Sequence, residues 1–190
     1  MKIYNLKISV NKLFHLTGHQ ASVYALAASA DDNLIYTGSS DKMIARWNIA
    51  DKKADNFAAT MPLAVYQLLY DAKVNRMYAG SGGGAVHVID LTSKKEIKNL
   101  ILHPNAAIFD LIKVEKYNLI ISAAADGSIA AIDADNFELN TKNKLCDQKL
   151  RSLCYIESSD VLLVASGDGF IRVLELPSLK VLNQFFAHEF

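Results

Sequence analysis

The sequence predicts an all-β fold in which a unit of four short strands occurs four times. Three observations support this prediction. A polar or glycine turn recurs with steps of 42, 43 and 42 residues, an apolar tetrad begins eighteen residues before each turn, and alternating apolar segments flank the turn. The recurring turn positions are Asp41, Gly83, Asp126 and Asp168. A constant period of this length indicates a repeat array in which neighbouring units share one core.

The first strand of each unit is the apolar tetrad. The four tetrads are VYAL from Val23, VYQL from Val65, IFDL from Ile108 and LRSL from Leu150. Short runs of β-branched and aromatic residues favour strands. We expect these four strands to be the innermost ones of their units.

The second and third strands form a hairpin around each recurring turn. The four hairpins read TGSSDKMIARWN, AGSGGGAVHVID, SAAADGSIAAID and VASGDGFIRVLE. An Asn or Asp eight residues before the turn position favours a reversal between the first and second strands. These residues are Asn33, Asn75, Asn118 and Asp160.

A more polar fourth strand follows each hairpin, near NFAAT (from Asn56), EIKNLI (from Glu96), FELNTK (from Phe137) and KVLNQFF (from Lys180). Each unit is therefore predicted to be four short antiparallel strands. The repeats lie near residues 19–60, 61–102, 103–145 and 146–187, within one domain spanning 1–190. KLFHL, at residues 12–16, is expected to be an additional N-terminal outer strand.

The period is also that of a WD repeat, which carries Gly-His near its start and Trp-Asp near its end. The first unit has Gly18-His19 and Trp47-Asn48, whereas the later units end in Ile89-Asp90, Ile132-Asp133 and Leu174-Glu175. On these residues the chain resembles the WD-repeat β-propeller family over roughly residues 12–190. The resemblance implies a β-propeller of WD-repeat type with about four blades per chain, which is half the length of a complete ring.

The resemblance also implies a buried hydrogen-bond chain that fixes the strands of a blade. In the first unit its members are His19, Thr37, Asp41 and Trp47. The indole N–H donates only and needs an acceptor when buried, which explains the hydroxyl and the imidazole. A weaker copy without the Trp is expected at His103, Ser122 and Asp126.

Composition excludes several function classes. Twenty basic and twenty acidic residues leave no net charge, and no run of five like charges is present, so nucleic acid is not an expected partner. Residues 1–10 alternate apolar and polar, which fits neither a signal peptide nor a membrane span. We expect a cytoplasmic protein with no membrane association. No Cys and His pair has metal-ligand spacing, so we expect no metal and no cofactor.

Two signals of catalysis have structural explanations. GSGGGA at residues 80–85 fits a dinucleotide-binding turn, but a strand rather than a helix follows it. An enzymatic or small-ligand-binding propeller with a site in the central channel is the alternative function. Among the innermost tetrads only Asp110 is acidic, and Gln67 and Ser152 hold the equivalent positions, so no catalytic carboxylate pair can be assembled there. The sequence therefore predicts a protein without enzymatic activity.

The second residue of each innermost strand is the best candidate for binding. In similar propellers this position lies at the channel rim, on the face that binds peptides or partner proteins, together with the residue before the turn. The predicted partner-binding residues are Tyr24, Tyr66, Phe109, Arg151 and Ser40. Aromatic residues and arginine are enriched in binding hot spots, which favours a protein-protein or peptide-binding scaffold. The alternative is that the rings only fill the channel.

An open arc of four blades is expected to expose one apolar face at each end. We expect the exposed residues of the first blade to be Val23, Leu26 and Ile35, and those of the fourth to be Leu153, Leu162 and Val164. Large exposed apolar patches are rare on soluble monomers. The sequence therefore predicts a homodimer that closes a ring of eight blades, with a fragment of a longer protein as the alternative.

Overall fold

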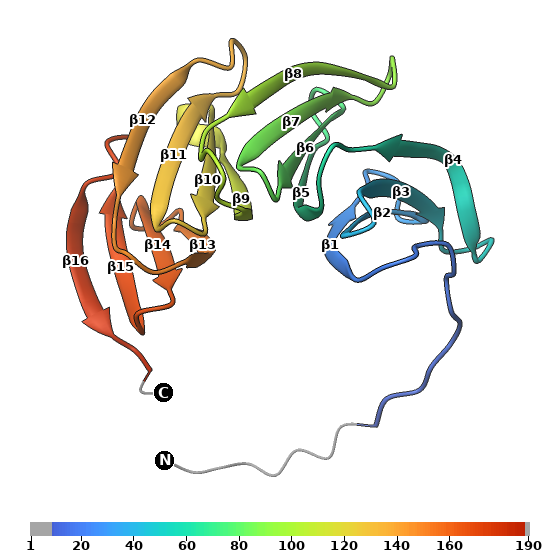
Figure 1. Cartoon of the computed structure of the whole chain (residues 1–190), viewed down its shortest axis with the longest axis horizontal. Coiled ribbons are helices and arrows are strands. Elements are labelled where there is room, and N and C mark those ends of the chain that lie inside the picture. The colour runs from blue at the N-terminus through green and yellow to red at the C-terminus, as the bar shows by residue number, and fades with distance from the viewer. Residues whose placement is uncertain (1–8, 189–190) are drawn as a thin grey trace.

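Sixteen β-strands form four antiparallel sheets that follow one another around an open arc (Figure 1). The computed structural model of the protein describes residues 9–188. In Figure 1 the inner strands β1, β5, β9 and β13 lie toward the centre of the arc, and the outer strands β4, β8, β12 and β16 lie on its convex side. The all-β propeller architecture predicted from the sequence is confirmed.

Each sheet is one blade, with its strands hydrogen-bonded in chain order from the inner to the outer strand. Blade one contains β1 (Val23–Ala28), β2 (Leu34–Ser39), β3 (Met43–Asn48) and β4 (Lys53–Thr60). Blade two contains β5 (Val65–Asp71), β6 (Arg76–Ser81), β7 (Ala85–Asp90) and β8 (Lys95–Ile101). Blade three contains β9 (Ile108–Val114), β10 (Leu119–Ala124), β11 (Ser128–Asp133) and β12 (Leu139–Lys144). Blade four contains β13 (Leu150–Ile156), β14 (Val161–Ser166), β15 (Phe170–Glu175) and β16 (Val181–Phe186).

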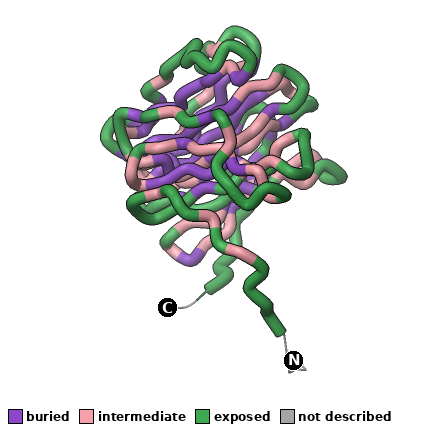
Figure 2. Tube along the Cα trace, turned by 90° about the vertical axis from the view of Figure 1, so that its right-hand side faces the viewer, coloured by how far each residue is buried: buried purple, intermediate pink, exposed green. Residues whose placement is uncertain are grey.

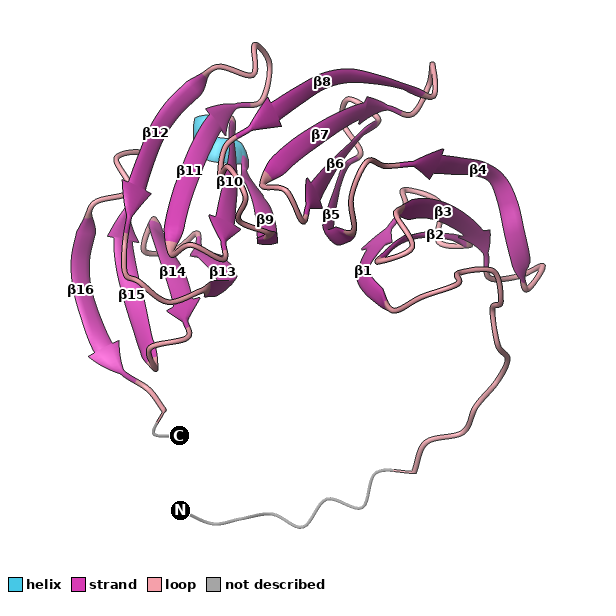
Figure 3. Cartoon of the chain, viewed as in Figure 1, coloured by secondary structure: helices cyan, strands magenta, loops and turns pink. Residues whose placement is uncertain are grey.

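The described part of the chain has almost no helix, as predicted. Within residues 9–188 the helical content is one 3₁₀ turn, η1 (Glu115–Tyr117), which is drawn in cyan in Figure 3. No helix in this part of the chain has the length and apolarity that a membrane crossing requires.

The recurring turns are equivalent in all four blades. Each is a three-residue hairpin loop whose last residue has a positive φ, at Lys42, Gly84, Gly127 and Gly169. The N–H of that residue donates to the carbonyl of the last residue of the preceding strand, at 3.2 Å in every blade. Glycine suits this left-handed position in three blades. In blade one a lysine adopts it, with φ of 68°.

The turn between the inner strand and the next one also follows the sequence pattern. Asn75, Asn118 and Asp160 all have positive φ, the conformation that short polar side chains tolerate best. Blade one uses another solution, in which the Asp31 carboxylate accepts a hydrogen bond from the Asn33 N–H at 2.9 Å.

The prediction of an N-terminal outer strand was wrong. Residues 12–16 lie in the described part of the chain and form no strand. The outer edge of blade four, where such a strand would pair, is already covered, because β16 pairs with β15 along its length. Lys52 instead places its ammonium group 5.9 Å from the centre of the Phe14 ring.

Neighbouring blades pack through apolar faces, and we call each such contact a seam. Three clusters of buried side chains fill the three seams of the arc, and Figure 2 shows the buried residues in the interior with exposed segments around them. Leu153, Leu162 and Val164 were predicted to be exposed, but they are buried in the seam between blades three and four. The prediction for blade one holds for two of its three residues, since Val23 and Leu26 are exposed, whereas Ile35 is half-buried.

Candidate functional site at the inner rim

One side chain from each blade contributes to a continuous ladder along the inner rim. The rim ladder consists of Tyr24, Tyr66, Phe109 and Arg151. The Tyr24 and Tyr66 rings stack with centroids 4.9 Å apart, and Tyr66 meets Phe109 edge to face at 5.6 Å. The guanidinium carbon of Arg151 lies 4.7 Å from the centre of the Phe109 ring, within cation–π range. The structure thus brings together four of the five residues predicted to bind a partner.

A β-bulge explains why these side chains point along the rim. In every blade the register between the inner strand and the next one shifts at the second residue of the inner strand, so that the ladder residue is left without a pairing partner. An extra residue of this kind leaves the regular alternation of the strand and re-aims its side chain. The sequence places the four residues in equivalent positions, but the bulge itself has no signal in a single sequence.

The ladder lines an open hollow of about 300 Å³. Tyr24 is 52% exposed, and Arg151 is also exposed. A second hollow, of about 510 Å³, shares Arg151 and is otherwise lined by Gln148, Lys149, Ser166 and Gly167. An aromatic surface therefore adjoins a cationic one, with Arg151 belonging to both.

The residues before the recurring turns form the floor beside the ladder. The Ser40 N–H donates to the carbonyl of Ser22 at 2.9 Å, and Gly82 makes the same bond to Ala64. A Cβ atom on Gly82 would lie 3.3 Å from the Tyr66 ring, so a small residue there leaves room for the ring. Ser40 is half-buried and does not line the ladder hollow, so the structure does not bring it together with the other four predicted residues.

Asp110 connects the three later blades next to the ladder. One carboxylate oxygen accepts from the Gln67 amide at 2.5 Å and from the Leu111 N–H at 2.8 Å. The other accepts from the Leu153 N–H at 2.7 Å and from the Ser152 hydroxyl at 3.3 Å. Asp110 is 8% exposed, and each oxygen has two donors. A carboxylate held in this way orders the strands and is poorly placed to move protons.

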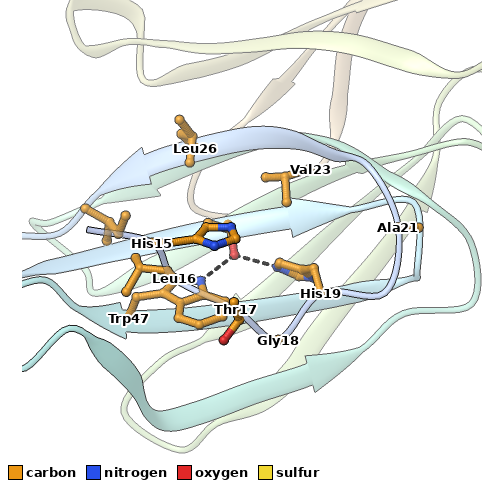
Figure 4. Close-up of a pocket in the computed structure, with 11 residues that line it drawn as sticks. His15, Leu16, Thr17, Gly18, His19, Ala21, Val23, Leu26 and Trp47 are labelled. Atoms are coloured by element: carbon orange, nitrogen blue, oxygen red, sulfur yellow. Dashed lines mark hydrogen bonds between the residues drawn. The ribbon is translucent and has the colours of Figure 1, made fainter. Parts of the chain in front are cut away.

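The residues predicted to form a buried chain in blade one are connected by hydrogen bonds. The Trp47 indole N–H donates to the Thr37 hydroxyl oxygen at 2.7 Å. His19 bridges that hydroxyl, at 2.7 Å from Nε2, to the Asp41 carboxylate, at 2.8 Å from Nδ1. The bonds of His19 and Trp47 to the hydroxyl are dashed in Figure 4. The network ties the segment before β1 to the hairpin and to β3.

Blade three keeps the histidine with serine partners. His103 is fully buried, with Nδ1 2.6 Å from the Ser128 hydroxyl and Nε2 2.8 Å from the Ser122 hydroxyl. Asp126 reaches it indirectly, by accepting from Ser128 at 2.7 Å. Burial lowers the pKa of His103 to about 4, so the ring is neutral at neutral pH and has one donor and one acceptor nitrogen.

Blade four replaces the histidine with an arginine that the sequence analysis missed. Arg172 is buried and donates to the Asp168 carboxylate and to the Ser166 hydroxyl, each at 2.5 Å. This guanidinium holds the pKa of Asp168 well below its ordinary value. Arg172 lies four residues after the turn aspartate, so an arginine at that spacing is the signal that was overlooked.

Replacing Trp47 with phenylalanine tests the network of blade one. The substitution keeps most of the apolar area but removes the indole donor to Thr37, and losing one partner of a buried hydrogen bond costs about 1 to 3 kcal/mol. We expect the free energy of unfolding in urea to fall by that amount. An unchanged denaturation midpoint would contradict the role assigned to this bond.

The polar groups of the site do not form a metal centre. Within the described residues 9–188, no group of three or more His, Cys, Asp or Glu side chains is arranged to hold a metal ion.

Comparisons with known proteins agree with the architecture. The family model described as "WD domain, G-beta repeat" matches residues 10–48. Cell division control protein 4 of Saccharomyces cerevisiae is 24% identical over 186 residues, which cover 88% of this chain and 23% of that protein. WD repeat-containing protein 81 of Rattus norvegicus is 23% identical over 190 residues, 94% of this chain and 10% of that protein. The chain thus spans less than a quarter of the length of either relative.

A solved structure shares the fold. The crystal structure of the computationally designed Ika4 protein superimposes with a TM-score of 0.73 and 24% identity, covering 88% of this chain and 99% of that one. The match over residues 10–48, the relatives and the four repeated sheets together show that the chain is similar to WD-repeat β-propeller proteins.

Proposed function

We propose that the protein is a non-catalytic scaffold that binds another protein or a peptide at its inner rim. The rim ladder is the observation that supports this proposal. A β-bulge in each blade turns one large side chain toward the same surface, and these four side chains contact one another in sequence. WD-repeat relatives are consistent with an interaction role.

The chemistry of the ladder suits a protein or peptide ligand. Tyrosine and phenylalanine offer large contact areas with few rotatable bonds, and arginine adds a planar cation. Tyrosine and arginine are enriched among the residues that carry most of the binding energy at interfaces. The hollow is open rather than enclosed, which fits an extended chain better than a small molecule that a pocket would surround. Lys149 and Arg151 add positive charge at one end, so a ligand with an apolar or aromatic segment followed by an acidic group fits both hollows.

An enzyme with a site in the central channel is less well supported. Asp110 is the acidic residue of the innermost tetrads, and both its oxygens are engaged by donors from the protein. General acid or base catalysis needs a group that is free to exchange a proton with a substrate within hydrogen-bond reach.

We also propose that the working unit is a homodimer. Two arcs of four blades form a ring of eight, which lies in the range of 4 to 8 blades where propellers close. The rim of such a ring has eight ladder positions instead of four.

Replacing Tyr24 with alanine tests the rim. Peptides are first selected on the wild-type protein from a random display library, and their affinities are then measured by fluorescence polarisation. Because hot-spot truncations cost about 2 kcal/mol or more, we expect at least a roughly 30-fold weaker affinity. The melting temperature should change little, since Tyr24 is half-exposed.

Phe185→Ala is the matched control for the rim test. Phe185 lies on the outer strand β16 and is 48% exposed, close to the exposure of Tyr24, but it is outside the ladder. Its affinity for the selected peptides should equal that of the wild type. Equal losses in both variants, or peptides that bind the Tyr24 variant normally, would refute a binding site at the rim.

A further inference from the structure

Blade one leaves uncovered the face that every later blade buries. The first residue of the inner strand is fully buried in the other blades, at Val65, Ile108 and Leu150. The equivalent Val23 is 45% exposed, and Leu26, on the same strand, is 69% exposed. Blade one therefore presents, at its end of the arc, the apolar surface that closes the other three seams.

The first two seams are closed by the same pair of positions. Val65 fills the space beside Gly38, and Ile108 fills the space beside Gly80. A Cβ atom on these glycines would come within 2.6 Å and 2.8 Å of the branched side chains. A small residue on the second strand of one blade thus accepts the first residue of the next blade's inner strand.

Blade four also has a small residue at this position of its second strand, but no further blade of the arc packs against it. In the third seam Leu150 and Ala123 belong to one cluster, with alanine in place of the glycines. Ala165 is the equivalent residue of blade four and is half-buried. It lies in a hollow of about 150 Å³, lined by Ser152, Leu153, Cys154, Leu163, Ala165 and Ile171.

We propose that Val23 of a second copy of this chain occupies the hollow at Ala165, forming a fourth seam like the other three. A two-fold axis along the channel makes this contact twice, blade four of each copy against blade one of the other. The third seam is the model for this pairing, because Leu150 and Ala123 belong to one cluster there. Val23 facing Ala165 needs the spacing of that seam, since in the first seam a Cβ on Gly38 would come within 2.6 Å of Val65.

The two faces also match in polarity. The hollow on blade one is lined by Val23, Leu26 and Ile35, with His15 and His19 at the same hollow. Its counterpart on blade four is lined by Cys154, Leu163 and Ile171 and has no acidic or basic lining residue. The hollow at Ala165 continues a row of three seams that this chain forms with its own blades. We therefore take a second copy of the chain to be its occupant. Its blade one carries the required apolar residues at the required spacing.

The fourth seam completes the proposed binding surface, and this part of the inference rests on the proposed function. Ladder residues of neighbouring blades touch across every existing seam. By the same spacing, Arg151 of one copy comes beside Tyr24 of the other. Each seam between copies then holds a composite site to which one copy contributes the cation and the other the aromatic ring.

Sedimentation equilibrium of Leu26→Lys tests the seam. We expect the wild type at micromolar concentration to have twice the 20.9-kDa mass of the chain, and the variant to have the mass of one chain. The lysine is placed at a largely exposed position of the single arc, so the circular dichroism spectrum should not change. Leu139→Lys is the control, since Leu139 is 55% exposed on the outer strand β12, away from the faces, and this variant should remain dimeric.

The native cysteines supply a second measurement. Cys154 is exposed in the single arc and lies in the proposed seam, whereas Cys146 is half-buried outside it. Alkylation of Cys154 should be slow in the wild type and in Leu139→Lys, and fast in Leu26→Lys.

A wild type with the mass of one chain and a freely alkylated Cys154 would overturn the proposal and leave the two faces to other blades or to another protein. If Tyr66→Ala loses peptide binding but keeps the mass of a dimer, the result supports both proposals and shows that the binding site and the dimer contact depend on different residues.

Discussion

Replacing Leu162 with alanine is expected to lower the free energy of unfolding by about 2 to 5 kcal/mol, the range for removing a large apolar side chain from a packed core. Leu162 has 0% exposure and belongs to the cluster between blades three and four. The substitution leaves a cavity in a seam that cannot easily collapse, since strands on both sides are held by hydrogen bonds. Urea denaturation followed by circular dichroism measures the loss.

Leu182→Ala is the control for this prediction. Leu182 is 55% exposed on the outer strand β16, and substitutions at exposed positions usually change stability by less than about 0.5 kcal/mol. Both variants are compared at a protein concentration low enough for single chains, so that association does not contribute. Similar losses at the two positions would contradict the assignment of the faces of blade four.

Leu162 also shows why the predicted exposure of the blade-four residues was wrong. A strand alternates between two faces, and a sequence with a constant period shows which residues share a face, but not which face meets the next blade. Leu153 and Leu162 are equivalent to Leu26 and Ile35, so both sets lie on the face directed toward the preceding blade. Within residues 9–188 no blade precedes blade one, so this face of blade one is exposed, whereas the same face of blade four is covered by blade three. A charged residue at Leu153 would therefore disrupt a seam within the chain.

The strands and the recurring turns could be predicted because their causes are local. Turn chemistry at Asp41 and the alternation around it define a hairpin without knowledge of the rest of the chain. The ladder position was predicted from the resemblance, but the bulge that aims its side chains depends on pairing between strands. The outer strand expected at residues 12–16 was not predicted correctly for a similar reason, since it depends on which segment pairs with β15, and β16 holds that position.

The hydrogen-bond chains show a third kind of limit. His19 and Trp47 were placed through a known signature, whereas Arg172 serves blade four from another strand and a different position. Several kinds of side chain can donate a hydrogen bond to the aspartate of the turn. A donor that is not part of the WD-repeat sequence pattern is therefore recognised only from the contacts in the structure. The network of blade four has the same structural role as those of blades one and three, although an arginine replaces the histidine. Each of these networks connects a turn to a neighbouring strand.

Replacing Asp110 with alanine is expected to destabilise the protein by about 2 to 6 kcal/mol. The buried N–H groups of Leu111 and Leu153 lose their acceptor, and each buried donor left unsatisfied costs roughly 1 to 3 kcal/mol. The Gln67 amide also loses its partner. Urea denaturation followed by circular dichroism gives the change, which should exceed that of Trp47→Phe because more donors are orphaned.

Asp147→Ala makes the same chemical change at a site where no such loss is expected. The Asp147 side chain is 98% exposed and its contact with Lys144, at 3.5 Å, is a surface ion pair, which contributes little to stability. Asp110→Asn adds a finer comparison, because it keeps the shape but turns one acceptor oxygen into a donor group that faces other donors. If Asp110→Ala unfolded at the same urea concentration as Asp147→Ala, the Asp110 carboxylate would not be the group that holds together the inner strands of blades two, three and four. The alignment of the rim ladder would then need another cause.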